Sequence, residues 1–326
     1  MKKKIKSLLG ILLAATLSLT ACGGSNTSDF TDEAVLKIDG HEIMKSEYMV
    51  YLYTTSQSFV ATAGEDVWNM DFDGQTADEL VAERTISTLQ SVIAAEKYAE
   101  ENGIALTAEE KEAARAAAEQ FIANVSKEDL AKMGMDVEKL TALMESSYLY
   151  SLVYQAISEE CAVDDAEVDS FFEANKADLM EEFQLLKVNS IVVNDLATAE
   201  EVLEKARSGE NFSKLFDEYD VVGDVAGEGE DGEMTVYRYY LEGEFGLSSD
   251  VTVGDVEGPF NMGSTYFILK VAAEKAPEEA NVKEMAGQTY RTNMQALHVE
   301  ERMAELMTGQ TVEKVEGVFE ALETFH

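Results

Sequence analysis

Several residue types on which common classes of site depend are scarce in this sequence. Its 326 residues include three histidines, two cysteines and two prolines. We find no zinc-ligand spacing, no phosphate-binding loop and no arrangement of a nucleophile with histidine and aspartate. We therefore expect no metal and no cofactor. The rarity of proline also argues against long proline-rich linkers.

Basic residues are scarce relative to acidic ones. Lys and Arg number 25 against 64 Asp and Glu, which leaves a formal net charge of −39. A surface this negative repels nucleic acid and anionic lipid head groups, so we expect no nucleic-acid partner. Apolar residues nevertheless make up 46% of the chain. That share is typical of a globular protein, and the length allows two domains.

The chain begins with a short apolar run. A basic start, MKKKIK, precedes SLLGILLAATLSL, and Leu-Thr-Ala-Cys closes the run at Cys22. Such a run is typical of a signal peptide rather than of a permanent membrane span. Its ending resembles a bacterial lipobox, in which the cysteine is lipidated. An ordinary cleavage site with a chance cysteine is the alternative.

These features predict a lipoprotein signal peptide over 1–21, a lipid on Cys22 and a flexible polar tether over 22–32. Acyl chains hold a protein at a bilayer by burying methylene groups. We therefore expect an extracytoplasmic protein anchored to the outer face of the bacterial cell membrane. A lipidated Cys22 leaves Cys161 without a disulfide partner. No histidine is near Cys161 in the sequence, so we interpret it as a quiet, partly buried thiol.

The segment 33–182 is expected to form a helical domain. It opens with a hairpin signal, Asp39-Gly40, between two apolar runs. Helix starts follow, marked by capping pairs three residues apart, and Gly103 is placed to end the first long helix. The capping pairs are Thr76 with Glu79, Thr107 with Glu110 and Ser126 with Asp129. Further helices are expected over 108–124, 127–133, 137–159 and 165–178.

The pattern changes to mixed α and β over 183–275. QLLKVNSIVV reads as a strand because it is rich in β-branched residues. Two helices are expected next, one capped by Thr198 with Glu201 at its third position and one with apolar residues at helical spacing from Phe212. Two strands, 255–260 and 265–272, complete the unit. Residues 276–326 are expected to return to the helical domain, which gives an α+β fold with an inserted domain.

A glycine-rich acidic loop lies within this insert. It carries five acids, Asp224, Glu228, Glu230, Asp231 and Glu233. Their spacing does not match a calcium loop of the Asp-x-Asp-x-Asp-Gly kind. We interpret the loop as a solvated acidic segment, with weak calcium association as the alternative.

The order of these parts resembles the PrsA/SurA group of secreted foldases over nearly the whole mature chain. Residues 183–275 look like a parvulin-type peptidyl-prolyl isomerase domain. The resemblance rests on Ala206-Arg207-Ser208-Gly209-Glu210-Asn211-Phe212, on Val253-Gly254-Asp255-Val256-Glu257-Gly258-Pro259 and on Tyr266-Phe267-Ile268-Leu269-Lys270-Val271. It implies a helical chaperone domain, an isomerase domain and unfolded or secreted polypeptides as partners. The sequence does not decide the oligomeric state, and a homodimer is one possibility.

The sequence departs from the parvulin pattern at the residues expected to carry catalysis. Ser190 stands where the family has a histidine in its first strand, and Phe267 where it has a second histidine. The acid that usually follows the second helix is absent or displaced in Asp220-Val221-Val222-Gly223. The family's Gly-Gly-Asp-Leu-Gly element is reduced to Gly229-Glu230-Asp231-Gly232. The three histidines, His41, His298 and His326, all lie outside the insert.

Prolyl isomerisation breaks no covalent bond, and its barrier of ~18–20 kcal/mol comes from amide resonance. An enzyme lowers it by holding the twisted amide in an apolar pocket within a tuned polar network. Without the histidines, Ser190 is the weak remaining catalytic candidate, or simply a strand residue. We also expect an apolar groove that binds a peptide. The alternative is that the residues of this groove fill the core of the domain. These residues are Met234, Tyr237, Tyr239, Tyr240, Phe245, Phe260, Met262 and Phe267.

Three functions remain open from the sequence. The first is an anchored chaperone with a degenerate isomerase domain, whose helical part offers a client surface that includes Tyr48, Met49, Tyr51, Leu52 and Tyr53. The alternative interpretation of those five residues is helix core. The second function is an active parvulin-type isomerase with an altered site. The third is a structural or ligand-binding surface lipoprotein.

Overall fold

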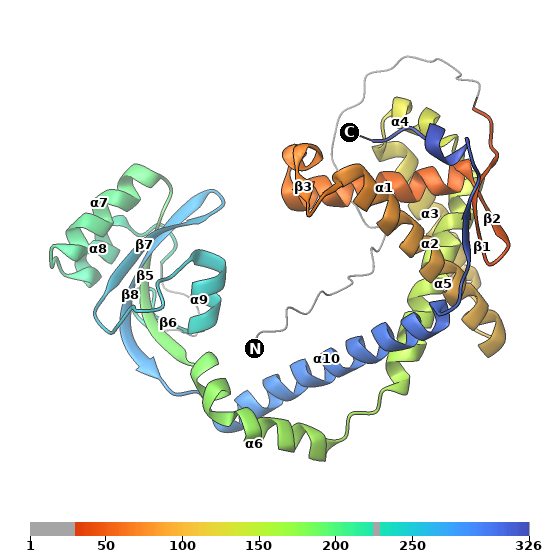
Figure 1. The fold of residues 1–326 in the computed structure, drawn as a ribbon. Helices are drawn as coiled ribbons and strands as arrows, with labels where there is room; N and C mark the ends of the chain where they lie inside the picture. Colours follow the sequence, from red (N-terminus) through yellow and green to blue (C-terminus); the bar gives the residue numbers. More distant parts are fainter. Residues whose placement is uncertain (1–29, 224–228, 326) are drawn as a thin grey trace. The chain divides into compact units, whose positions relative to one another are not determined.

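The computed structural model describes residues 30–223 and 229–325, which form two compact units (Figure 1). The first unit combines the described chain up to Ala162 with the chain from Met294 onward. The second unit is the continuous segment Val163–Asn293. The expected signal peptide, the lipid site at Cys22 and all but the last residues of the expected tether lie outside the described residues.

A three-stranded antiparallel sheet joins the two chain ends of the first unit. Its order is β2 (His41–Met44), β1 (Ala34–Ile38) and β9 (Val312–Lys314). The turn between β1 and β2 has positive φ at Asp39 and Gly40, as the Asp-Gly pair predicted. β9 extends the sheet by pairing with Leu36, Lys37 and Ile38.

Most of the remaining chain of the first unit, up to Ala162, is helical. The helices are α1 (Lys45–Ala63), α2 (Ala77–Asn102), α3 (Ala108–Asn124), α4 (Lys127–Met133) and α5 (Val137–Glu160). A short 3₁₀ turn, η1 (Glu65–Asn69), and a small hairpin of β3 (Asp71–Phe72) and β4 (Gln75–Thr76) separate α1 from α2. The capping boxes at Thr76 and Thr107 and the cap at Ser126 are confirmed. Gly103 ends α2 in the left-handed conformation.

The core of the first unit lies where α1, α2, α3 and α5 meet the sheet. Tyr48, Met49 and Leu52 on α1 are among its buried members. The alternative interpretation of these α1 residues is therefore confirmed: Tyr48, Met49, Tyr51 and Leu52 are buried in the helix core, and Tyr53 packs against it, so they form no exposed client surface. η2 (Phe319–Ala321) and Phe325, in the segment after β9, complete this core.

The second unit is built on a four-stranded antiparallel sheet. Its order is β6 (Met234–Tyr237), β5 (Leu185–Val193), β8 (Thr265–Lys275) and β7 (Val256–Met262). The helices are α6 (Asp165–Glu182), α7 (Leu196–Arg207), α8 (Phe212–Tyr219), α9 (Arg238–Phe245) and the start of α10 (Glu279–Met307). The expected α+β fold is confirmed.

Different helices cover the two faces of this sheet (Figure 1). α7 and α8 pack on the face that carries Ile191, Val193 and Ile268. α9 packs on the other face, over Val188, Phe267 and Leu269. This follows from the alternation of side chains along a strand, which sends neighbours in sequence to opposite faces.

Helix α6 packs with the first part of α10. Phe172, Leu179, Val282 and Ala286 form their shared core, and Lys283 pairs with Asp169 at 2.7 Å. The sequence predicts that α6 belongs to the helical domain, 33–182, that precedes it. Its contacts instead group it with the second unit.

Some details differ from the sequence expectations. α7 is capped by Asp195 rather than Thr198, because the Asp195 carboxylate accepts hydrogen bonds from both the amide and the hydroxyl of Thr198. Asp32, expected in the flexible tether, accepts from the amide and hydroxyl of Ser46 and pairs with Lys139 at 2.7 Å. The tether therefore gives way to ordered structure before residue 33.

Candidate functional site

Strand β5 carries Ser190 to the face of the sheet that α9 covers. Ser190 shares this face with Val188 and Val192, and it pairs with Leu269 on β8. Val192 pairs with Phe267, two residues along β8. The structure thus places Ser190 and Phe267 as diagonal neighbours on one face of the sheet.

The polar groups of Ser190 are already engaged with the protein's own main chain. Its side chain is 5% exposed, and its Oγ donates to the Gly232 carbonyl at 3.1 Å. The Ser190 amide donates to the same carbonyl at 3.2 Å. Gly232 has φ +62°, and a Cβ there would lie 2.3 Å from the Ser190 carbonyl oxygen. The serine therefore fixes the loop before β6 against the edge of β5.

Phe267 is the centre of an aromatic cluster. Its ring centroid lies 4.9 Å from that of Phe245 on α9 and 5.0 Å from that of Phe260 on β7. Phe245 also contacts Phe260 at 6.3 Å and Tyr240 at 5.7 Å, both edge to face. Leu241, Leu247 and Val251 pack behind these rings. The described members of the cluster around Phe267 are apolar side chains.

The expected groove residues divide into three groups. Met234, Phe245, Phe260 and Phe267 belong to the apolar cluster on the α9 face. Tyr240 and Met262 are exposed, at 47% and 54%. Tyr240 contacts the cluster through Phe245, while Met262 stands at the end of β7, two residues beyond Phe260.

Tyr237 and Tyr239 do not line this surface. They stack on each other at 5.5 Å, and each contacts Phe183 edge to face. The Tyr237 hydroxyl lies 3.2 Å from the Met285 sulfur on α10. The expectation that both belong to the groove was wrong, because the strand-to-helix junction between β6 and α9 directs them toward the α6–α10 core.

Asp220 is the acid that directly follows α8, and its role is structural. One carboxylate oxygen accepts from the Val192 amide at 2.7 Å, and the other accepts from the amides of Val222 and Gly223 at 2.9 and 2.5 Å. Val221 in turn donates to the Val192 carbonyl. Asp220 therefore closes the free edge of β5.

The described part of the acidic loop is also tied into the fold. Ser213 donates to the Asp231 carboxylate at 3.0 Å, and Lys187 pairs with Glu233 at 2.8 Å. Asp224 and Glu228 lie outside the described residues. Within the described ranges, no group of three or more His, Cys, Asp and Glu side chains is arranged to hold a metal ion.

The described histidines lie in the first unit. His41 is exposed on β2, and His298 on α10 has its Nε2 3.8 Å from a Glu160 oxygen. His326 lies outside the described residues. None of the described helices is both long enough and apolar enough to span a bilayer.

Sequence reasoning missed α9, which supplies Tyr240, Leu241 and Phe245. Two local signals could have found it: Arg238 and Glu242 at helical spacing, and Gly246 at the C-terminal end. In the structure Arg238 pairs with Glu242 at 2.8 Å and donates to the carbonyls of Ser249 and Val251. Arg238 thus fixes both α9 and the loop that follows it.

Comparisons with known proteins agree with the resemblance seen in the sequence. A foldase protein PrsA from Caldanaerobacter subterraneus subsp. tengcongensis is 23% identical over 278 residues, which cover 83% of this chain and 82% of the relative. Another, from Halalkalibacterium halodurans, is 24% identical over 279 residues, covering 81% of this chain and 73% of the relative. The chain is a relative of the PrsA-type foldases.

The chain is also similar to a protein of known structure. A SurA-like chaperone of Campylobacter jejuni aligns with a TM-score of 0.40 and 14% identity, over 87% of this chain and 99% of that one. No family model matches the sequence. The PrsA-type assignment therefore rests on the two curated relatives and on the order of parts along the chain.

Proposed function

We propose that this PrsA-type chain is a lipid-anchored extracytoplasmic chaperone that binds unfolded secreted polypeptides. In this proposal, residues 1–21 are removed, Cys22 carries the lipid, and residues 183–275 are a parvulin-like domain that binds peptide without isomerising it. The helical domain comprises 33–182 and the returning segment 276–326. The N-terminal sequence supports the anchor, and the PrsA relatives support a role in folding other proteins.

The observation that carries the proposal is the neighbourhood of Ser190 and Phe267. The Ser190 hydroxyl is committed to the Gly232 carbonyl, and Phe267 is surrounded by Phe245 and Phe260. Catalysis of amide rotation requires polar groups that stabilise the twisted state better than the ground state. Here the Ser190 hydroxyl is bonded within the protein, and the described residues around Phe267 offer an apolar surface instead.

The exposed edge of this surface is suited to holding a peptide. Tyr240 and Met262 present apolar area to solvent beside the Phe245–Phe260–Phe267 cluster. Aromatic and methionine side chains adapt to varied apolar partners. A client segment with apolar side chains would therefore bind here through burial of area rather than through a specific hydrogen-bond pattern.

An aggregation assay tests the chaperone proposal. The mature protein is added to a reduced, unfolding client, and light scattering is followed over time. We expect suppression at a few-fold molar excess and weaker suppression by the double variant Tyr240→Ser, Met262→Ser. The control is Leu196→Ser with Val253→Ser, which removes two other exposed apolar side chains from the same unit. Loss of suppression in both double variants, or none in the wild type, would count against the proposal.

A protease-coupled assay on a peptide with an Ala-Pro-Phe core separates binding from isomerisation. We expect the mature protein to leave the cis-to-trans rate at its uncatalysed value. A rate well above background that is lost in Ser190→Ala would establish the chain as an isomerase with an altered site.

A further inference from the structure

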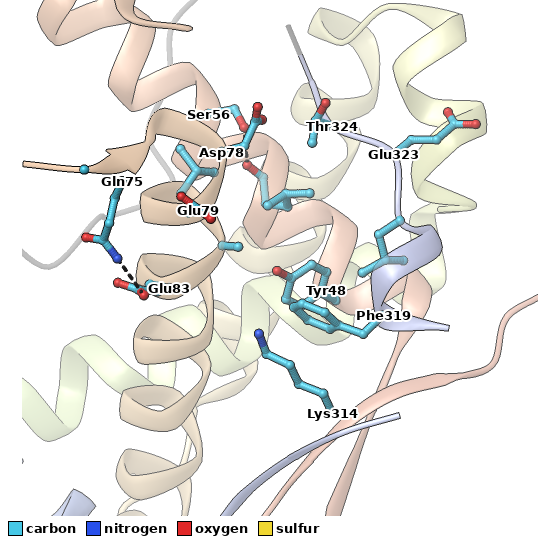
Figure 2. A pocket seen from close by; sticks show the side chains of 15 residues that line it. Tyr48, Ser56, Gln75, Asp78, Glu79, Glu83, Lys314, Phe319, Glu323 and Thr324 are labelled. Carbon is cyan, nitrogen blue, oxygen red and sulfur yellow. Dashed lines mark hydrogen bonds between the residues drawn. The ribbon is translucent and has the colours of Figure 1, made fainter. Parts of the chain in front are cut away.

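The first unit contains a cavity of about 510 Å³ that the proposed function does not use. It lies between α1, the start of α2 and the segment that follows β9 (Figure 2). All of its walls belong to the first unit. Its shape is therefore set within one compact unit.

The inner wall of the cavity is apolar. Leu52 on α1 and Val81 on α2 are buried there, and Phe319 and Leu322 close it from the C-terminal segment. The ring of Tyr48 meets that of Phe319 edge to face at 5.4 Å. The wall can therefore receive an apolar side chain of a ligand.

Tyr48 adds an unused polar atom to this wall. The residue is 1% exposed, and its hydroxyl makes no hydrogen bond to any residue that the structure describes. Figure 2 shows the hydroxyl pointing into the space between α2 and the C-terminal segment. A hydroxyl that faces the cavity can form a hydrogen bond with a carbonyl or amide group of a ligand at this point.

The rim of the cavity is strongly acidic. Four carboxylates line it, from Asp78, Glu79, Glu83 and Glu323, against the single ammonium group of Lys314. Glu79 accepts hydrogen bonds from Thr76, Glu83 accepts one from Gln75 at 3.0 Å, and Lys314 stands 4.2 Å above the Phe319 ring. These contacts leave an excess of negative charge around an apolar floor.

We propose that this cavity binds a segment of polypeptide in which an apolar side chain is flanked by lysine or arginine. The apolar side chain would enter between Leu52, Val81 and Phe319, and the basic groups would face Glu83 and Glu323. The Tyr48 hydroxyl would bond to the main chain of the segment. The inference takes from the proposed function only that the ligands are unfolded polypeptides. It assigns a charge preference to the helical unit, independently of the Phe267 surface.

Fluorescence anisotropy with labelled nonapeptides tests this preference on the full mature chain. The basic probe alternates Leu and Lys, and its partners replace Lys by Gln, Lys by Glu, or Leu by Ser. We expect the basic apolar probe to bind most tightly and the Glu probe least, with affinity for the basic probe falling as salt is raised. Equal binding of the Lys and Glu probes, or binding that survives replacement of every Leu, would overturn the inference.

Matched variants locate the binding. Glu83→Gln with Glu323→Gln removes two rim charges from exposed positions, while Glu109→Gln with Glu112→Gln removes two exposed charges from α3. We expect the rim pair to weaken the basic probe about three- to tenfold and the α3 pair less than about twofold. Equal weakening by both pairs would mean that the net charge of the protein, not the cavity, attracts the probe.

Tyr48→Phe keeps the ring contact with Phe319 and removes only the hydroxyl. We expect the basic probe to bind about two- to fivefold more weakly to this variant, since one neutral hydrogen bond is lost. Unchanged affinity in both Tyr48→Phe and the rim pair would refute the site. If the site is refuted but the protein still suppresses client aggregation, the proposed function stands and the cavity plays no part in it. If the probe binds tightly at the cavity but the protein suppresses no aggregation, the cavity site stands and the proposed function fails.

Discussion

At the scale of single residues, Ser190 shows a buried hydroxyl used to hold a loop in place. Its hydroxyl and amide both donate to the Gly232 carbonyl, so the residue connects β5 to the loop before β6. Phe267, its diagonal neighbour, belongs to an aromatic cluster. The pair is better explained by packing and loop closure than by acid–base work.

Replacing Ser190 by alanine should therefore cost stability. Loss of the buried hydrogen bond to Gly232 is expected to lower the free energy of unfolding by about 0.5–1.5 kcal/mol. Urea unfolding followed by circular dichroism measures this change. Ser170→Ala is the control, because Ser170 is exposed on α6 and bonds only within its own helix turn. Equal losses in both variants would contradict the assigned role of Ser190.

A second residue-scale expectation concerns Glu47 on α1. Burial raises the pKa of its carboxyl from 4.5 to about 7, with added repulsion from Glu96 and Asp32. Between pH 4.5 and 7, the Glu47 carboxyl is therefore mostly protonated in the folded state and mostly ionised in the unfolded state. The stability contributed by this group is accordingly full below about pH 4.5, falls as pH rises, and is lost above about pH 7.

Glu47→Gln should remove this dependence. We expect the variant to exceed the wild type by on the order of 2 kcal/mol at pH 8 and to approach it at pH 5. The single tryptophan, Trp68, lies in the first unit and reports its unfolding by fluorescence. Glu112→Gln on the exposed face of α3 is the control and should leave the difference between pH 5 and pH 8 unchanged. A parallel shift of both variants would refute the assignment to Glu47.

At the scale of elements, the segment after α10 supplies both a strand and a buried aromatic ring to the first unit. β9 pairs with β1, and Phe325 is buried with its ring 5.2 Å from that of Tyr53 on α1. Removing this ring leaves a cavity between α1 and the C-terminal segment. The two elements that close the unit come from opposite ends of the described chain.

Phe325→Ala should lower the free energy of unfolding of the first unit by about 3 kcal/mol, as is usual for a buried phenylalanine. Trp68 fluorescence in urea follows the change. Glu316→Ala, on the exposed part of the same segment, should leave the midpoint unchanged. A midpoint that moves equally in both variants would mean that the segment acts through charge rather than through packing.

Elements marked by local signals were predictable from the sequence. The hairpin at Asp39-Gly40, the helix starts at Thr76 and Thr107 and the helix from Phe212 each depend on neighbouring residues. β9 was not found, because its three residues are exposed and become a strand only by pairing with β1. Short, polar edge strands carry little pattern of their own.

The candidate site was predictable to a similar degree. The shared face of Ser190 and Phe267 follows from register, once β5 and β8 are paired. The position of Tyr237 could not be predicted in this way. It depends on the direction in which the chain leaves β6 and on packing against α6 and α10, which are distant from Tyr237 in the sequence. Asp220 was seen in the sequence, but its bonds to the β5 edge required the structure.

At the scale of the whole molecule, the second unit is one continuous segment with its own sheet and cores. Residues 163–293 should therefore fold alone and unfold cooperatively, as circular dichroism and thermal melting would show. Residues 30–162 alone lack β9, the end of α10 and Phe325, so we expect them to be unstable until residues 294–326 are supplied in trans. A stable, cooperatively folded 30–162 fragment would contradict this division.

The pairing of β9 with β1 has a consequence for biogenesis. A chain that emerges from its N-terminus presents β1 first, yet the neighbour that covers its edge comes almost last. The segment between them contains a complete unit, which can finish folding while β1 waits. The edge of β1 is thus available to other extended chains until residues 312–314 have been synthesised and can pair with it.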